Sequence, residues 1–285
     1  MIRLLFSTFI LLSLWCSTCP AARAQAPATQ PNAQPAAPAA TATPATAAPT
    51  TTPSPTEKTE GDDGRTWLQV GAAKQPAFYL REMSGTTYGG VLIIPDNGSH
   101  PESRGSVDRL RRNLADNHWH TLALDISGLD PDTIQQAVAA GVAFLNNKGV
   151  FNIAIIGRGR GAAHALRYIA AIPPAQGGKI HQIRALVMVN ADNAVAGLGR
   201  EPMAPLAKLR LPVLDAYTAT DLDQQRQATA RRRLGRPGNK KFQQIRLPDA
   251  IGVRKPDRES QESKRIRGWL DNNVAGYMVG GEPKN

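Results

Sequence analysis

The chain has 285 residues, 41% of them hydrophobic, and a formal net charge of +11. This length is sufficient for one domain with a packed core. The only two cysteines, Cys16 and Cys19, lie near the N-terminus. Removal of residues 1–24 therefore excludes a disulfide-stabilised fold, a thiol nucleophile and a thiolate metal site.

Residues 1–24 have the features of a secretory signal peptide. Arg3 supplies the positive charge, residues 4–15 form the apolar stretch, and residues 22–24 contain the small residues of a cleavage site. The apolar stretch is short for a membrane span, and an uncleaved anchor is the alternative interpretation. We therefore expect a periplasmic or secreted protein. Its mature net charge is +9, because the segment contains Arg3 and Arg23 but no acidic residue.

Residues 25–64 form a low-complexity segment rich in alanine, proline and threonine. The segment lacks the large apolar side chains that would offset the entropy lost on ordering, so we predict a disordered tether. The folded domain is predicted to span residues 65–277, and residues 278–285 are predicted to form a flexible tail.

Strands and helices alternate through the predicted domain. The first two strands, at 67–70 and 77–81, are close enough in sequence to form a hairpin. Further strands are expected at 91–94, 119–125, 153–156, 185–189, 212–217 and 242–247, and helices at 107–115, 131–146, 162–172, 222–234 and 260–274. This alternation, with continuous apolar central strands, predicts a mostly parallel sheet with helices on both faces. Functional groups are then expected at the carboxyl ends of the strands.

The stretch from 151 to 163 (FNIAIIGRGRGAA) carries the most informative motif. An apolar β-branched run is followed by Gly157, Gly159 and Gly161 and then by a predicted helix. Strand, tight turn and helix in this order form the frame of the nucleophile elbow, G-x-S-x-G. Gly159 stands where the serine of that motif would be. Glycine relieves the backbone strain that a side chain would cause at such a turn.

Several segments together carry a resemblance to a known fold. They are VLIIPDNGSHPES with the following LRRNLADNHWHTLALDI, IAIIGRGRGAAHALRYI, LPVLDAYTATD and the terminal KRIRGWL. With these segments, the chain resembles the α/β-hydrolase superfamily and, more closely, an uncharacterised family of secreted bacterial α/β-hydrolase-like proteins. The resemblance implies an α/β-hydrolase-like sheet.

The resemblance also implies where a catalytic triad would lie. It puts the nucleophile at Gly159, the acid at Asp221 or, less well, at Asp215, and the histidine in the loop 248–252. That loop contains no histidine, and none occurs after His181. Two of the three groups that a serine hydrolase needs are therefore missing. We expect a non-catalytic binding or accessory protein of the cell envelope, and we interpret Asp221 as a helix N-cap.

The alternative is a serine-esterase-type hydrolase with a displaced active site. Ser99 and His100 would then act together in the loop after the strand 91–94, with Asp96 and Glu102 nearby. Adjacent residues rarely face each other suitably, which favours a structural role for the loop. His118 and His120 have metal-ligand spacing on a strand, but no third ligand is evident. We therefore predict no metal site.

The glycine turn has two further interpretations. Gly157, Gly159 and Ala162 fit the dinucleotide motif G-x-G-x-x-A. The ribose-binding acid is missing at its usual distance, and Asp192 is the nearest candidate. We therefore expect no cofactor.

Alternatively, the turn binds an anion through its backbone amides and its flanking arginines. The ligand-binding residues of this hypothesis are Arg158, Arg160, Asp96 and Asn97. The ligand would be an anionic envelope component: a lipid head group, a polysaccharide or a cell-wall fragment.

Residues 226–246 contain eight basic and no acidic residues. The segment is interpreted either as a solvated helix face that favours solubility or as a patch that adheres to an anionic surface. Nucleic acid is not an expected partner outside the cytoplasm. A monomer is expected.

Overall fold

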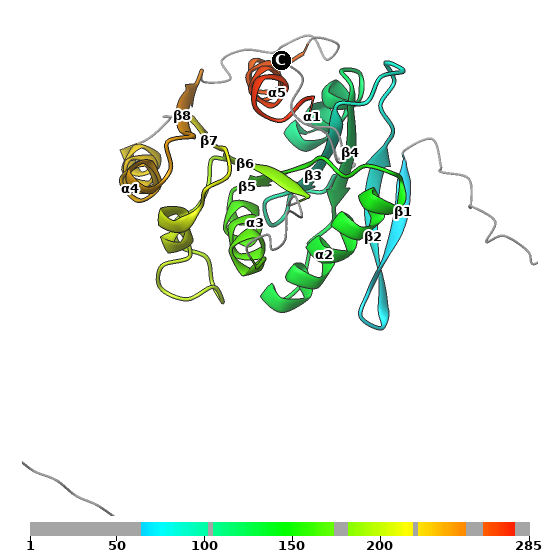
Figure 1. Ribbon diagram of the computed structural model, residues 1–285. Helices are drawn as coiled ribbons and strands as arrows, with labels where there is room; N and C mark the ends of the chain where they lie inside the picture. Colours follow the sequence, from blue (N-terminus) through cyan, green and yellow to red (C-terminus); the bar gives the residue numbers. More distant parts are fainter. Residues whose placement is uncertain (1–63, 102–104, 174–181, 219–221, 249–258, 277–285) are drawn as a thin grey trace, which may run out of the picture. The chain divides into compact units, whose positions relative to one another are not determined.

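The computed structural model describes residues 64–101, 105–173, 182–218, 222–248 and 259–276 (Figure 1). The predicted signal peptide, the predicted tail and all but the last residue of the predicted tether lie outside the described residues. Within the described ranges, no helix combines the length and the apolar character that a membrane span requires.

The element order agrees with the predicted alternation. The strands are β1 (Arg65–Val70), β2 (Ala73–Leu80), β3 (Gly89–Ile94), β4 (Trp119–Leu124), β5 (Ile153–Arg158), β6 (Ile183–Val189), β7 (Val213–Thr218) and β8 (Phe242–Leu247). The helices are α1 (Ser106–Ala115), α2 (Pro131–Asn147), α3 (Arg160–Ala171), α4 (Leu222–Gly238) and α5 (Gln261–Asn273), with a short 3₁₀ helix, η1 (Ala204–Lys208).

The strands form one eight-stranded sheet in the order β1-β2-β4-β3-β5-β6-β7-β8. β1 and β2 pair as the predicted antiparallel hairpin, and β2 also pairs antiparallel with β4. All the other neighbours are parallel. The prediction of a mostly parallel sheet is therefore confirmed, and the turn after β5 lies at the carboxyl edge of a central strand.

Helices cover both faces of the sheet, as predicted (Figure 1). α1 and α5 lie on one face, and α2, α3 and α4 lie on the other. Side chains alternate between the faces along each strand. On β3, Val91 and Ile93 belong to the hydrophobic cluster beneath α1 and α5, whereas Leu92 and Ile94 belong to the cluster on the α2 and α3 side.

The helix ends follow from local sequence. α2 begins with Pro131 after Asp130, whose side chain accepts hydrogen bonds from two backbone N–H groups of the first turn. α4 continues to Gly238, beyond its predicted end at Leu234. The helix continues although Gly235 and Pro237 disfavour it, and a Cβ at position 235 would come within 2.6 Å of Phe242. Glycine is therefore required there by the close packing of α4 on β8.

Candidate functional site

The turn between β5 and α3 has the backbone of an elbow. Gly159 has φ +50° and ψ −121°, a region that residues with side chains rarely adopt. Its N–H donates to the Val189 carbonyl at 3.0 Å, and its carbonyl accepts from the Asp192 N–H at 3.2 Å. The apex of the turn is thus tied to the end of β6.

The two outer glycines are required by close backbone contacts. A Cβ at Gly157 would lie 2.4 Å from the Ala162 Cα, and a Cβ at Gly161 would lie 2.4 Å from the carbonyl oxygens of Ile94 and Pro95. Neither backbone can move away without disturbing the sheet or α3. These glycines therefore allow the close approach of helix, strand and loop that the G-x-x-x-G frame implies.

The carboxylate of Asp96 lies in the space that a side chain at position 159 would need. A Cβ built on Gly159 would be 2.4 Å from Oδ2 and 2.7 Å from Oδ1 of Asp96. Asp96 belongs to the loop after β3, so the sheet brings it to the turn from the neighbouring strand. A nucleophile at the apex would collide with this carboxylate.

Asp96 also occupies the N-terminus of α3. Its Oδ1 accepts hydrogen bonds from the N–H of Asn97 at 2.8 Å and from the N–H of Arg160 at 3.1 Å. The N-terminus of a helix favours negative charge. In hydrolases with the elbow, the N–H that follows the nucleophile contributes to the oxyanion hole. In this chain that N–H, on Arg160, is bonded to the protein's own carboxylate.

The two arginines of the turn have different surroundings. The Arg158 guanidinium is mostly buried and bonded to the Glu262 carboxylate on α5. The Arg160 side chain is exposed. Of the four predicted ligand-binding residues, the structure brings together Asp96, Asn97 and the Arg160 backbone, and it pairs Arg158 with another element. Anion binding at the turn stays a prediction.

A second carboxylate lies close to the turn. Asp192 follows β6 and is half-buried. Burial raises its pKa, the neighbouring Asp96 charge adds to this effect, and Arg160 and Arg231 oppose it. Two carboxylates therefore lie near the anion-favouring end of α3. They disfavour any anionic ligand at this turn, both the pyrophosphate of the dinucleotide interpretation and the envelope component of the anion-binding hypothesis.

The residues of the predicted displaced site do not form a nucleophile–base pair. His100 Nε2 lies 3.4 Å from Asp125 Oδ2, and its ring packs edge-on against Phe78. The Ser99 N–H donates to the Asp96 carbonyl at 3.0 Å. Among the described residues, no hydrogen bond joins the Ser99 hydroxyl to His100. Glu102 lies outside them.

The two residues predicted as candidates for the acid of a catalytic triad are Asp221 and Asp215. Asp221 lies outside the described residues. Asp215 is completely buried in β7, where Arg231 Nε contacts both its oxygens at 3.0 Å and Gln244 donates to Oδ2 at 2.7 Å. Burial raises the pKa of Asp215, whereas the Arg231 charge and these hydrogen bonds favour the carboxylate. Asp215 thus belongs to the interior.

The prediction that all the basic residues of 226–246 are exposed is wrong for Arg231. The exposed fraction of its side chain is 0%. Its Nη1 donates to the Ala191 carbonyl at 2.6 Å and to Asn193 Oδ1 at 3.0 Å. Arg231 therefore fastens α4 to β7 and to the loop after β6.

The histidines are placed as structural groups. His120 is buried and 2.7 Å from the Tyr79 hydroxyl, whereas His118 is half-buried, contacts Ser84 and stacks on Tyr88. His164 is buried in α3. No group of three or more metal-ligating side chains occurs in the part of the chain that the structure describes.

Residues 5–133 and 129–272 match the family model described as "Protein of unknown function (DUF3530)". The chain belongs to this family. The resemblance to an uncharacterised α/β-hydrolase-like family is thereby confirmed.

Solved structures with the same fold include esterases and dienelactone hydrolases. The esterase domain of a Rhodothermus marinus protein is 14% identical, with a TM-score of 0.57, and covers 74% of this chain and 99% of its own. The dienelactone hydrolase from Anabaena variabilis is 16% identical, with a TM-score of 0.57, and covers 74% and 97%. Est1E from Butyrivibrio proteoclasticus is 14% identical, with a TM-score of 0.53, and covers 73% and 96%. At these identities the likeness establishes the α/β-hydrolase-like fold.

A search of curated protein sequences gave no match.

Two residues near the predicted sites could not be identified from the sequence alone. Asp125 faces His100, and Glu262 pairs with Arg158 across the fold. Asp125 had a signal, because it directly follows an apolar strand. Glu262 had none, since 104 positions separate it from Arg158.

Proposed function

We propose that this protein is an exported, non-catalytic α/β-hydrolase-like protein that binds an anionic component of the cell envelope. The observation that carries the non-catalytic part of the proposal is the Asp96 carboxylate at the apex of the elbow, whereas the anionic ligand is supported by the basic residues of 226–246. The Asp96 carboxylate takes the space of the missing nucleophile and one of the N–H groups that would stabilise an oxyanion. A substrate carbonyl placed there would meet a negative charge.

The proposal is supported by the sequence around the expected triad. A serine hydrolase needs a hydroxyl, an imidazole and a carboxylate in one place. Position 159 has no side chain, and no histidine follows His181. Replacement of one group alone would therefore not restore the mechanism.

A hydrolase with a displaced site is the second candidate. The contact between His100 and Asp125 favours it, because a carboxylate that orients an imidazole is two-thirds of a triad. The hydroxyl of Ser99 is the nearest nucleophile in sequence, but it is not bonded to that imidazole. This geometry favours the non-catalytic function.

An ester panel separates the two candidates. The purified chain is mixed with p-nitrophenyl esters of short and medium acyl chains, beside an active esterase as a positive control. We expect no turnover above the buffer rate for the wild-type chain or for Ser99→Ala and His100→Ala. Turnover of any ester by the purified wild-type chain would overturn the proposal; its loss in either variant would place the active site at Ser99 and His100, and its survival in both would place it elsewhere.

Export is tested by cell fractionation and N-terminal sequencing. We expect a mature chain that begins at Gln25 outside the cytoplasm. Ala24→Lys should block cleavage, since a small residue is needed before the cut, and Ala28→Lys serves as a control beyond it. A cytoplasmic, uncleaved wild-type chain would contradict this part of the proposal.

A further inference from the structure

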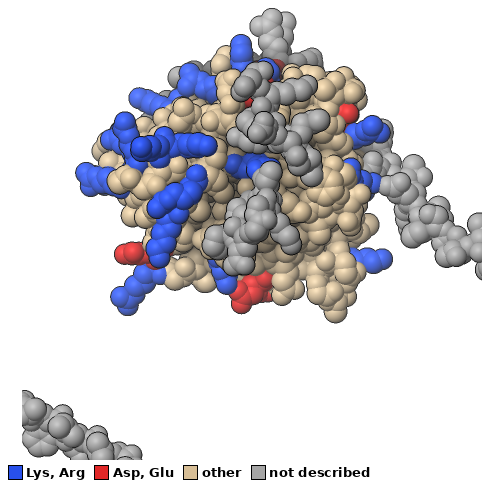
Figure 2. Space-filling view, in the orientation of Figure 1, with Lys and Arg blue, Asp and Glu red and all other residues tan. Residues whose placement is uncertain are grey.

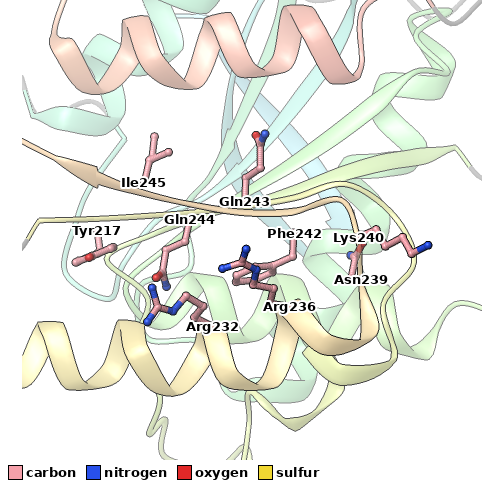
Figure 3. Close-up of a pocket in the computed structure, with 9 residues that line it drawn as sticks. All are labelled: Tyr217, Arg232, Arg236, Asn239, Lys240, Phe242, Gln243, Gln244 and Ile245. Atoms are coloured by element: carbon pink, nitrogen blue, oxygen red, sulfur yellow. The ribbon is translucent and has the colours of Figure 1, made fainter.

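A groove of about 690 Å³ lies between α4 and β8 at the edge of the sheet (Figure 3). Its lining includes Tyr217, Arg232, Arg236, Asn239, Lys240 and Gln244. We call it the α4–β8 groove. It is far along the sheet order from the elbow, because β6 and β7 separate β5 from β8. The volume suits a small molecule or a head group.

Two arginines of the groove come from one face of α4. Arg232 and Arg236 are four residues apart, so their side chains project from successive turns about 6 Å apart along the helix. In Figure 3 both guanidinium groups point from α4 toward β8, with Gln244 and Tyr217 beside them. Like charges at this spacing repel each other and destabilise the helix.

No acidic partner of these arginines occurs among the described residues. The structure gives no ion pair to Arg232, Arg236 or Lys240 within that part of the chain, and the sequence has no Asp or Glu from 224 to 248. The nearby Asp215 carboxylate is already bound by Arg231 and Gln244. Figure 2 shows Lys and Arg gathered over the α4 and β8 side of the face in view.

The framework of the groove is fixed from both sides. Gly235 packs against Phe242, where any larger residue would collide. One turn earlier in α4, the buried ion pair of Arg231 and Asp215 holds the helix against β7. The two guanidinium groups are thus presented by a helix that cannot shift easily, which lowers the cost of ordering them around a ligand.

We propose that the α4–β8 groove binds a ligand that carries two phosphate groups on a short polar skeleton. Each guanidinium forms paired hydrogen bonds with one phosphate. The Gln244 Nε2 group already donates to Asp215 and to the Ala228 carbonyl, so its amide oxygen is left to accept from a hydroxyl group of a sugar between the phosphates, and the Tyr217 hydroxyl is suited to the same sugar. The inference deepens the proposed binding function by giving its ligand class, and it is independent of the elbow.

The same helix supplies matched controls. Arg226 and Arg233 are exposed on α4 but line a different surface hollow, with Leu222 and Thr229. Neutralising them changes the net charge of the protein as much as neutralising Arg232 and Arg236 does. A non-specific attraction would respond equally to both pairs, whereas a built site would respond only to the groove pair.

The test uses the purified chain with two forms of bisphosphate. Calorimetry measures binding of fructose 1,6-bisphosphate, with fructose 6-phosphate and inorganic phosphate as comparison ligands. Sedimentation measures binding to phosphatidylcholine vesicles with and without a bisphosphorylated glucosamine lipid.

We expect Arg232→Gln and Arg236→Gln each to weaken bisphosphate binding at least about tenfold. Arg226→Gln and Arg233→Gln should change it less than about threefold. Unchanged thermal midpoints show that all four variants fold.

Each outcome has a defined meaning. Groove-dependent binding of the soluble bisphosphate supports the proposal with a free ligand, and groove-dependent binding of the glycolipid vesicles alone supports it with a membrane head group. Equal losses in the two pairs of variants, equal affinity for mono- and bisphosphate, or no binding to any probe would overturn it. None of these results depends on ester turnover, so failure of the groove and failure of the non-catalytic proposal are separable.

Discussion

Arg231 on α4 and Asp215 on β7 form an ion pair in which neither side chain has exposed surface. The guanidinium Nε contacts both carboxylate oxygens at 3.0 Å, and Nη1 donates to the Ala191 carbonyl and to Asn193. One residue of the basic segment thus joins a helix, a strand and the loop after β6. The neighbouring arginines face solvent or the α4–β8 groove.

Removal of one partner of this pair should be strongly destabilising. In Arg231→Met the Asp215 charge stays buried without its counterion, so we expect a loss of about 3–5 kcal/mol in the free energy of unfolding. Urea denaturation followed by circular dichroism measures it. Arg232→Met, one position along the same helix but exposed, should change stability by no more than about 0.5 kcal/mol. Similar losses in both variants would show that the buried pair has no special role.

The elbow gives a second prediction, which concerns the contact between position 159 and Asp96. Gly159→Ala places a Cβ 2.4 Å from the Asp96 carboxylate and at φ +50°. We expect a loss of about 1–3 kcal/mol from backbone strain and collision together. The measurement is again the free energy of unfolding in urea.

Gly98→Ala separates the two causes. Gly98 also has a positive φ, +85°, but a Cβ there would have no neighbour within 4 Å, so only backbone strain of about 1 kcal/mol is expected. In an Asp96→Ala background the excess cost at position 159 should disappear, because the colliding carboxylate is gone. An excess cost that persists without Asp96 would contradict the geometry described for the elbow.

The fold could be predicted from the sequence to a large extent, because it depends on local patterns. The continuous apolar run of β3 and the glycines after β5 have physical meanings that are visible in the chain itself. The extension of α4 to Gly238 could not be predicted. Gly235 and Pro237 disfavour helix locally, and the close packing of Gly235 on Phe242 in the extended helix is not recorded in any local pattern.

The candidate site was only partly predictable for the same reason. The absence of a nucleophile at Gly159 is a property of one position and can be read directly. The role of Asp96 as the group that fills the apex depends on the pairing of β3 with β5. The burial of Arg231 likewise required the placement of Asp215 in a strand beneath α4, so a run of basic residues in the sequence was not a reliable guide to exposure.

A third prediction concerns stability in mild acid. Burial lowers the pKa of His120, with a contribution from Arg81 and opposition from Glu82, and burial also lowers the pKa of His164. The unfolded chain then binds protons at a higher pH than the folded chain. Stability is therefore lost as the pH falls below about 6.5 toward the folded values.

Unfolding in urea at a series of pH values between about 7 and 5 measures this effect. His120→Gln should reduce the slope of stability against pH. Tyr79→Phe, which removes the hydrogen bond to His120 but keeps the imidazole, should lower stability by about 1 kcal/mol and leave the slope unchanged. A slope that is the same in His120→Gln and in the wild-type chain would rule out His120 as its source.

The fourth prediction concerns Asp192, whose pKa is raised by burial and by the Asp96 charge. Between the ordinary pKa of about 3.8 and the raised value, the folded chain binds more protons than the unfolded chain, so stability falls as the pH rises through this window. Above the window the ionised carboxylate destabilises the fold. We therefore expect Asp192→Asn to unfold at a higher urea concentration than the wild-type chain at neutral pH, and the gain should vanish in acid.

Asp116→Asn, at an exposed position after α1, is the charge-matched control. The gain should also shrink in an Asp96→Asn background, because Asp96 supplies part of the repulsion. A gain that is independent of pH, or one that Asp96→Asn leaves intact, would mean that the two carboxylates at the elbow do not interact.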